Sequence, residues 1–231
     1  MRFFMGFAMA VCLAFPAAAA QRLFMLDFVF LNENVTLAAR DAYNAKAAPI
    51  AARHGVELQA TLDPVRVVIG PQSLDRLDLW TLPEPAALKQ WGDDPDYQAM
   101  RVETLAVHDM THLTLYLARE MGPVRIAPSG LYWVEFLRFD EAGFNGDDFS
   151  AYMAEIDAIA GKHAMRRVAT FGKVGRILGQ GFQAHWMNIY SVADPAQLEE
   201  NLRDPRFVER AAMRNRLFDM DKSMMGVFQA R

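Results

Sequence analysis

The chain is almost without cysteine, since Cys12 is the only one in 231 residues. It lies in an apolar run that follows Arg2 and ends in Pro16 and four alanines. A basic residue, an apolar run and small residues are typical of a secretory signal peptide. We expect residues 1–20 to be removed, which leaves a periplasmic or secreted chain with neither disulfides nor a cysteine nucleophile. An uncleaved membrane anchor is the alternative, but the run is short for a span of ~20 residues.

The chain also lacks an excess of positive charge. It has 24 Lys and Arg against 28 Asp and Glu, and a net charge of −4. No basic patch is present that would attract nucleic acid or an anionic lipid surface. No further segment is long and apolar enough to span a membrane. We therefore expect no nucleic-acid partner and no membrane association after signal cleavage, and a content of 52% hydrophobic residues is ordinary for a globular core.

A long internal similarity is present instead. Residues 43–61 read YNAKAAPIAARHGVELQAT, and residues 152–170 read YMAEIDAIAGKHAMRRVAT. Tyr43 aligns with Tyr152, and both stretches then share an Ile, a His and a final Ala-Thr. Further on, Asp-Pro-Asp-Tyr at 94–97 aligns with Asp-Pro-Arg-Phe 110 positions later. A match over so much of the chain indicates two copies of a domain-sized module.

We place the first module at residues 21–118 and the second at residues 131–231. The segment between them, residues 119–130, is interrupted by Gly and Pro and has no sustained periodicity, which is typical of a linker. Apolar and β-branched runs predict four strands in the first module, and helical spacing and acidic-Pro helix starts predict the helices. The strands are residues 23–31, 65–69, 76–82 and 112–118, and the helices are residues 36–54 and two short pieces opened by Glu84-Pro85 and Asp94-Pro95.

This order is β-α-β-β-α-β, the ferredoxin-like split βαβ unit. The helices of such a unit cover one face of an antiparallel sheet, and the other face needs a partner. Two units in one chain can supply each other's partner. The predicted fold class is therefore α+β, with two tandem ferredoxin-like modules that form an intrachain pseudo-dimeric α/β barrel.

The same segments carry a resemblance to a known group. The Ala-rich run from Tyr43 to Gly55 and the DPDYQAM run at 94–100 resemble the dimeric α/β-barrel superfamily. Within it the chain is most similar to a small bacterial family of unknown function. The run RLDLWTLPEP at 76–85 makes the NIPSNAP-like proteins a second candidate. The resemblance implies a fold shared by cofactor-free monooxygenases, isomerases, haem enzymes and proteins without known activity, so the fold does not select the function.

Two carboxylates are the candidate catalytic residues. Asp27 and Glu135 occupy matched positions in the first strand of each module, among large apolar side chains. If they face the space between the two sheets, burial would raise their pKa values toward that of a general base. The alternative is that they point outward or lie at an edge.

A second matched set forms the candidate ligand-binding site. Asp78 and Asn188 occupy the third strands, and Trp80 and Tyr190 follow two residues later. Side chains two apart share one face of a strand, so the set could line a pocket with aromatic walls and a few polar groups. The alternative is an aromatic core with a polar strand end.

The histidines give no comparable pattern. Tyr43 and His54 share a helix face but are separated by ~16 Å of helix, so they cannot form a dyad and are better explained as structural. His108 and His112 have metal-ligand spacing only if they lie on a helix, and we expect a turn there. A haem would need one axial His, for which His54, His163 and His185 are available without any motif that selects one. We predict neither a metal site nor a cofactor.

The function predicted from these features is that of an exported α/β-barrel protein that binds a small molecule. It would be a cofactor-free enzyme, monooxygenase-like or isomerase-like, that acts on an apolar or aromatic compound. A non-catalytic interaction or assembly module is one alternative, and a haem or metal enzyme is the other. A cavity between the sheets would favour the enzyme, and a solid apolar layer there would count against the enzyme and favour the interaction module. The expected partner is a small apolar ligand, and the chain would be a monomer or a homodimer.

Overall fold

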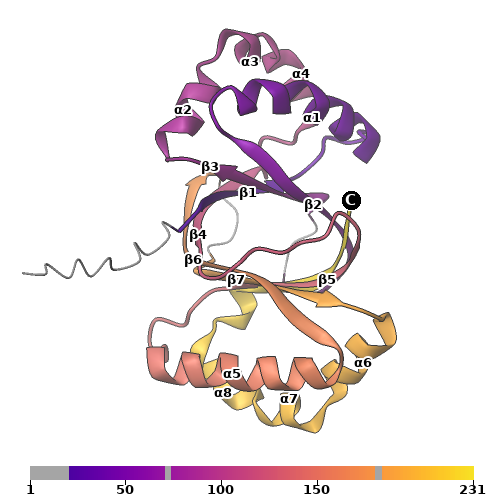
Figure 1. The fold of residues 1–231 in the computed structure, drawn as a ribbon, viewed down its shortest axis with the longest axis vertical. Coiled ribbons are helices and arrows are strands. Elements are labelled where there is room, and N and C mark those ends of the chain that lie inside the picture. Colours follow the sequence, from indigo (N-terminus) through magenta and orange to yellow (C-terminus); the bar gives the residue numbers. More distant parts are fainter. Residues whose placement is uncertain (1–20, 71–73, 180–183) are drawn as a thin grey trace, which may run out of the picture.

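The described residues form a closed barrel of antiparallel strands with a layer of helices on each side (Figure 1). The computed structural model describes residues 21–70, 74–179 and 184–231. The predicted signal peptide, residues 1–20, lies outside the described residues. Among the described helices, none is long and apolar enough to cross a membrane.

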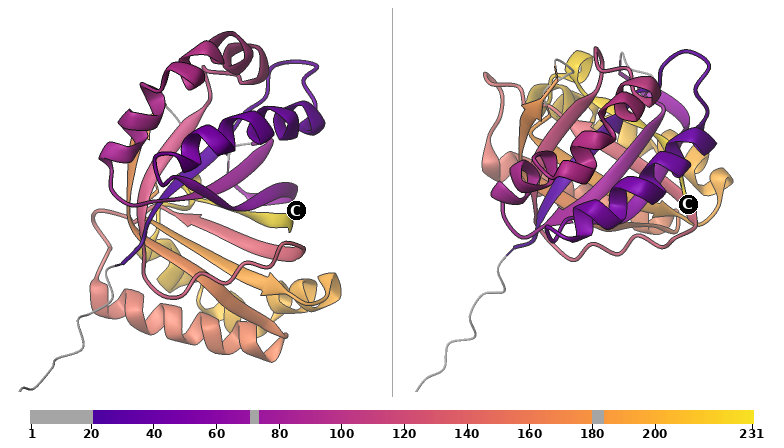
Figure 2. Two further views of the ribbon diagram at one scale, coloured as in Figure 1. Left: turned by 45° about the horizontal axis from the view of Figure 1, so that its top comes forward. Right: turned by 90° about the horizontal axis from the view of Figure 1, so that it is seen from above.

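Each half of the chain contributes four strands and one helical layer (Figure 2). The first half contains β1 (Leu23–Val29), α1 (Leu37–Ala52), β2 (Glu57–Ile69), β3 (Arg76–Leu82), α2 (Ala86–Gly92), α3 (Pro95–Ala99), α4 (Arg101–Val107) and β4 (Thr114–Glu120). The second half contains β5 (Gly130–Leu137), α5 (Gly146–Lys162), β6 (Met165–Leu178), β7 (Trp186–Val192), α6 (Pro195–Arg203), α7 (Pro205–Glu209), α8 (Ala211–Leu217), a 3₁₀ turn η1 (Met220–Lys222) and β8 (Met224–Ala230).

The predicted fold class is confirmed: the protein is α+β, and the two ferredoxin-like units close into one barrel with the strand order β1-β3-β2-β8-β5-β7-β6-β4. One prediction was too short. The strand expected at 65–69 begins at Glu57, because Pro64 and the polar residues before it do not end the strand. Pro64 lies at an irregularity in the pairing of β2 with β8, where its missing N–H is tolerated.

Two long strands join the halves. The first part of β2, up to Leu62, pairs with β3 of its own half, and the rest pairs with β8 of the other half. In the same way β6 pairs with β7 up to Phe171 and then with β4. Each long strand therefore leaves its own sheet and crosses to the opposite one. As a result, Ile177 and Leu178 of the second half lie against the first half.

The interior of the barrel is filled with apolar side chains, many of them aromatic. Phe28 packs edge-on against Phe136 with ring centroids 4.4 Å apart, and Phe24 packs against Phe171 at 4.9 Å. All four rings are fully buried. The hypothesis of a ligand site between the sheets is therefore wrong, since large rings occupy that space.

Successive strand residues face opposite sides, so the residues between these rings lie under the helices. In β1, Phe24, Leu26 and Phe28 point into the barrel. Asp27 points out to α1, where it meets Arg40. Glu135 has the corresponding place in β5, between the inward-facing Val134 and Phe136.

The helix starts follow the predicted capping pattern with one exception. Asp94, Asp194 and Asp204 each accept a backbone N–H two residues later, and a Pro follows each of them. The helix expected to open at Glu84-Pro85 begins at Ala86 without a side-chain cap. A histidine after each of the two long helices, α1 and α5, contacts one of these capping aspartates. His54 Nε2 lies 2.8 Å from Asp94 Oδ2, and His163 Nε2 lies 3.0 Å from Asp204 Oδ2.

We expect substitution of either glycine that ends a long strand to destabilise the fold. Gly70 and Gly179 have φ values of +108° and +88°, and an added Cβ would lie 2.6 Å from the carbonyl oxygen of Ser223 or 2.1 Å from that of Leu113. Strained backbone alone costs about 1–3 kcal/mol. Gly70→Ala and Gly179→Ala should each lower the melting temperature by at least about 2–4 °C, measured by circular dichroism.

Gly161→Ala is the matched control, since Gly161 lies in α5 and a Cβ there meets nothing within 4 Å. Alanine favours a helix over glycine by about 1 kcal/mol, so this variant should melt at the same temperature or higher. Equal melting temperatures for all three variants would contradict the proposed close approach of the strand ends.

Candidate functional site

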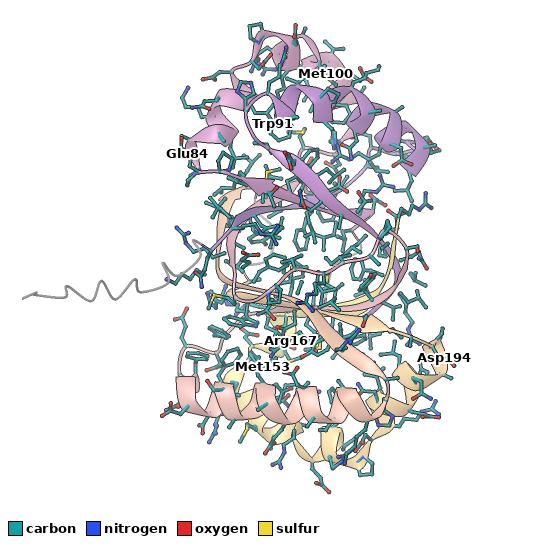
Figure 3. All side chains as sticks on the ribbon, viewed as in Figure 1. Glu84, Trp91, Met100, Met153, Arg167 and Asp194 are labelled. Carbon is teal, nitrogen blue, oxygen red and sulfur yellow. The ribbon has the colours of Figure 1, made fainter. Side chains whose placement is uncertain are left out.

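A cavity of about 230 Å³ lies between the helices of the first half and the outer face of β1, β3 and β4. Its walls are mainly aromatic and aliphatic, and its polar groups gather on one side. Trp91, at the end of α2, lies between this helical layer and the sheet (Figure 3). The polar side chains that line it are Asp27, Arg40, Asn44, Thr104 and His108, and the aromatic ones are Tyr43, Trp80, Trp91 and Tyr97. This composition is typical of small-molecule sites, and the volume suits a ligand below drug size.

Arg40 is the centre of the polar side. It extends from α1, is only 2% exposed, and donates to Asp27 Oδ2 at 3.0 Å and to Asp78 Oδ2 at 2.8 Å. The two carboxylates lie directly opposite each other in β1 and β3. Two buried like charges at such a position would repel, so the guanidinium between them is needed to hold both.

The two aspartates differ in what they can offer a ligand. Asp78 is fully buried, and both of its carboxylate oxygens accept hydrogen bonds. Asn44 also donates to its Oδ2 at 3.1 Å, and Thr61 donates to its Oδ1 at 2.9 Å. Asp27 Oδ1 has no hydrogen-bond partner among the described residues. Asp27 lines the cavity, whereas Asp78 anchors the network behind it.

The pKa of the Asp27 carboxyl is raised to about 7. Burial is the main cause, the charge of Asp78 adds to it, and the charge of Arg40 opposes it. A carboxyl with such a pKa exchanges its proton close to neutral pH, as an efficient general acid or base does. The pKa shift therefore agrees with the geometry, which leaves one oxygen of this carboxyl free.

His108 cannot take this role. Its Nδ1 lies 2.8 Å from the carbonyl oxygen of Thr104, which can only accept, so Nδ1 carries the proton. Its Nε2 then accepts from Arg40 Nη1 at 2.7 Å. Burial and the neighbouring Arg40 lower its pKa to about 4. A neutral ring with both nitrogens engaged holds the arginine in place and offers nothing to a substrate or metal.

Several polar atoms around the cavity are buried and unpaired. Besides Asp27 Oδ1, they are Arg40 Nε, Asn44 Oδ1, Trp80 Nε1 and Trp91 Nε1. All five residues line the cavity. Buried polar groups nearly always have a partner, and leaving one unpaired costs about 1–3 kcal/mol. Two acceptors and three donors are therefore buried and unpaired in the side chains that form the walls of this cavity.

At the equivalent place in the second half, the polar side chains around Glu135 hydrogen-bond to one another. Glu135 Oε1 accepts from Trp133 Nε1 and its Oε2 accepts from Asn188 Nδ2, both at 3.0 Å. Asn188 Oδ1 accepts from Trp186 Nε1 at 2.9 Å. Burial raises the pKa of Glu135. Tyr190 donates away from this group to Asp157 Oδ1 at 3.2 Å.

Large apolar side chains fill most of this second place. The residues 109 or 110 positions after Arg40, Asn44, Ala47 and His108 are Phe149, Met153, Ile156 and Phe218. Met153 lies between α5 and the strands (Figure 3), and all four pack in the second-half core. The space beside Glu135 is about 10 Å³, enough for about one water molecule and far smaller than the cavity of the first half.

The predicted site residues therefore lie in two places. Asp27, Asp78 and Trp80 come together at the first cavity, and Glu135, Asn188 and Tyr190 lie on the opposite side of the barrel. Both sets lie under the helices and not between the sheets. The sequence reasoning missed Arg40, although its spacing of three, four and seven residues from Tyr43, Asn44 and Ala47 puts it on the buried face of α1.

The residues of this cavity do not fit a haem. An axial ligand needs a free imidazole nitrogen, and both nitrogens of His108 are engaged. The three histidines considered from the sequence lie elsewhere: His54 and His163 brace helix caps, and His185 Nδ1 accepts the N–H of Phe139. Within residues 21–70, 74–179 and 184–231, no cluster of three or more His, Cys, Asp or Glu side chains could hold a metal ion.

No family model matches the chain, and no curated protein matches it. Solved structures do resemble it over nearly their whole length. An anthrone oxidase-like protein has a TM-score of 0.55 at 10% identity, with 91% of each chain covered. A mutant chlorite dismutase from Candidatus Nitrospira defluvii has a TM-score of 0.54 at 9% identity, with 90% of this chain and 91% of that one covered.

A candidate monooxygenase from Fusobacterium nucleatum has a TM-score of 0.53 at 8% identity, with 93% of this chain and 94% of that one covered. Identities this low establish the shared fold and not a shared activity. The similarity to a particular small family, or to the NIPSNAP-like proteins, stays a prediction. The chain has the fold of the dimeric α/β-barrel proteins, with both halves of the barrel supplied by one polypeptide.

Proposed function

We propose that the protein binds a small apolar or aromatic compound in the cavity of the first half, and that Asp27 exchanges a proton with it without a cofactor. The observation that supports this most directly is the set of unpaired polar atoms around the cavity, with Asp27 Oδ1 among them. The oxidase-like and monooxygenase structures with this fold support small-molecule chemistry in such a barrel.

The chemistry follows from the groups that face the cavity. The Asp27 carboxylate takes a proton from an acidic C–H or O–H of the ligand. The negative charge left on the ligand is stabilised by the N–H groups of Arg40, Trp80 and Trp91 that lack partners. Return of the proton from Asp27 to a different ligand atom completes an isomerisation, in which the ligand neither gains nor loses an atom or an electron. A monooxygenase-like reaction would begin with the same proton removal and then consume dioxygen.

A non-catalytic interaction module is the competing function. The apolar barrel interior would suit it, because the two sheets simply pack on each other there. It does not account for a cavity lined by five unpaired polar atoms, since polar groups without a ligand only reduce stability. Binding without turnover would be the result that favours this alternative.

Filling the cavity should abolish ligand binding. Ala47 lies on α1, is 1% exposed and lines the cavity, and its equivalent in the second half is Ile156. Ala47→Ile therefore introduces a side chain that the protein already accommodates at the equivalent position. A library of small aromatic and lipid-like compounds, screened by thermal shift and native mass spectrometry, should give ligands for the parent protein that this variant no longer binds.

Ile156→Ala is the matched control on the other side of the barrel. It should cost about 2–5 kcal/mol of stability, as expected for a buried truncation, and leave the affinity for the same ligands unchanged. Ligands that bind Ala47→Ile as tightly as the parent protein would place binding elsewhere and contradict the proposal.

Asp27→Asn should remove proton exchange but not binding. The carboxylate form is the base, so hydrogen exchange of a bound ligand with solvent should rise with pH through about 7 in the parent protein. The asparagine variant should show neither the exchange nor this pH dependence, measured by NMR in deuterated water with a ligand from the screen. Equal exchange rates in the two proteins would exclude Asp27 as the base. Oxygen uptake that depends on Asp27 would identify the monooxygenase-like reaction.

The stability of the same variant tests the protonation of Asp27 without any ligand. The folded protein raises this pKa above its unfolded value of 3.8, so the folded state holds the proton more tightly. The contribution of Asp27 to stability therefore falls as the pH rises from about 4 to about 7. Asp27→Asn should gain stability relative to the parent across this window, by an amount on the order of a few kcal/mol, in urea unfolding at each pH.

We also propose that the protein is exported with removal of residues 1–20. The support is the arrangement of one basic residue, an apolar run and small residues before Gln21. Expression of the full sequence in a bacterium should give periplasmic protein whose first residue is Gln21, as read by N-terminal sequencing. Membrane-bound material that still begins at Met1 would show an anchor instead.

A further inference from the structure

A second hollow adjoins the cavity on its outer side. It has a volume of about 260 Å³ and is formed by α3, α4 and the turn after α4. Three of its side chains, Tyr97, Thr104 and Met110, also line the inner cavity. The other lining residues are Gln98, Arg101 and Leu105. These three side chains therefore form a boundary that the inner cavity and the outer hollow share.

Arg101 is a cation without a counterion in this hollow. It makes no hydrogen bond or ion pair within the described residues, and the nearby carboxylates in the sequence are committed to other cations. Both oxygens of Glu103 accept from Lys46, at 2.8 and 3.0 Å. Asp96 pairs with Arg53 at 2.8 Å. The balance of charge on this side of the molecule leaves the Arg101 guanidinium free to bind an anion.

The hollow also has apolar walls that a ligand would cover. Leu105 is 50% exposed and Met110 is 44% exposed, which is high for residues of their size. Both line the outer hollow with Arg101, and Met110 also lines the inner cavity. An aliphatic chain leading from the cavity to the guanidinium would lie along them and remove this apolar surface from water.

The position of Arg101 holds no cation in the second half. Arg101 begins α4, and Ala211 begins the equivalent α8. The cavity residues Arg40, Asn44 and His108 are likewise replaced by apolar residues in the second half. The cation and the cavity therefore occur together in one half, as expected if both bind parts of the same molecule.

We infer that the ligand is a carboxylic acid whose apolar or aromatic body fills the inner cavity and whose carboxylate binds Arg101 in the outer hollow. This inference rests on the proposed function and adds the substrate class. An arginine fork can hold a carboxylate through two parallel hydrogen bonds. Because the hollow is open to solvent, this pair should be moderate in strength and sensitive to salt.

A series of phenylalkanoates tests the inference and measures the length of the chain. Phenylacetate, phenylbutyrate and phenylhexanoate are compared with their amides, which have the same shape without the charge. Binding is followed by the quenching of tryptophan fluorescence, since Trp80 and Trp91 line the cavity. At one chain length the acid should bind about five- to tenfold more tightly than its amide, and added salt should reduce the difference.

Arg101→Gln should remove this preference and leave the affinity for the amide unchanged. Arg203→Gln is the matched control, because Arg203 is 81% exposed on α6 of the other half. It should keep the full preference for the acid. Equal binding of acid and amide at every length, or an unchanged preference in Arg101→Gln, would overturn the inference.

The outcomes also separate this inference from the proposed function. If acids and amides bind equally and Ala47→Ile abolishes both, the cavity binds ligands but Arg101 does not select acids. If neither series binds, the inference of an apolar acid is overturned, and the library screen with Ala47→Ile decides the proposed function by itself.

Discussion

The crossing of β2 and β6 from one half-sheet to the other is the constraint on which the rest of the structure depends. Each strand pairs first within its own half and then with the opposite half, so the two sheets cannot separate without breaking both ladders. Among the described residues, apolar and aromatic side chains fill the interior of the barrel that this crossing closes. The cavity of the first half lies between a sheet and its helices, and the end of β6 supplies Ile177 and Leu178 to its lining.

The two halves stabilise a buried acidic side chain in different ways. Each buries an acidic residue in its first strand, opposite a polar residue in its third strand. The first half neutralises Asp27 and Asp78 with Arg40, which leaves one carboxyl oxygen and several donors unpaired around a cavity. The second half surrounds Glu135 with the N–H groups of Trp133 and Asn188 and fills the remaining space with apolar side chains.

Much of the fold could be predicted from the sequence, because strand alternation, helix caps and the similarity between residues 43–61 and 152–170 are local signals. The sequence matched Asp27 with Glu135 and Asp78 with Asn188, but it did not predict that Asp27 lies opposite Asp78 and Glu135 opposite Asn188, because that depends on the register of strands far apart in the chain. The face on which these residues lie could not be predicted. A strand buried on both sides is apolar at every position, so its pattern does not indicate which side meets the helices.

Arg40 was missed because a charged residue on a helix is expected to face solvent, although its spacing from Tyr43 and Ala47 places it on the buried face of α1. A cavity is space that the surrounding side chains leave unfilled, and a single sequence does not show where such space remains. The comparison of Ala47 with Ile156, however, reveals the difference in volume that opens it.

The connection of both halves through the segment 121–129 has an evolutionary consequence. In a barrel assembled from two identical chains, symmetry places every substitution in both halves at once. A mutation that opened a cavity or buried an arginine would then destabilise the molecule twice. In a single polypeptide, one half can keep its packing and contribute stability while the other accumulates polar groups that are unfavourable for folding. Selection for chemistry and selection for stability can thus act on different halves of the same barrel.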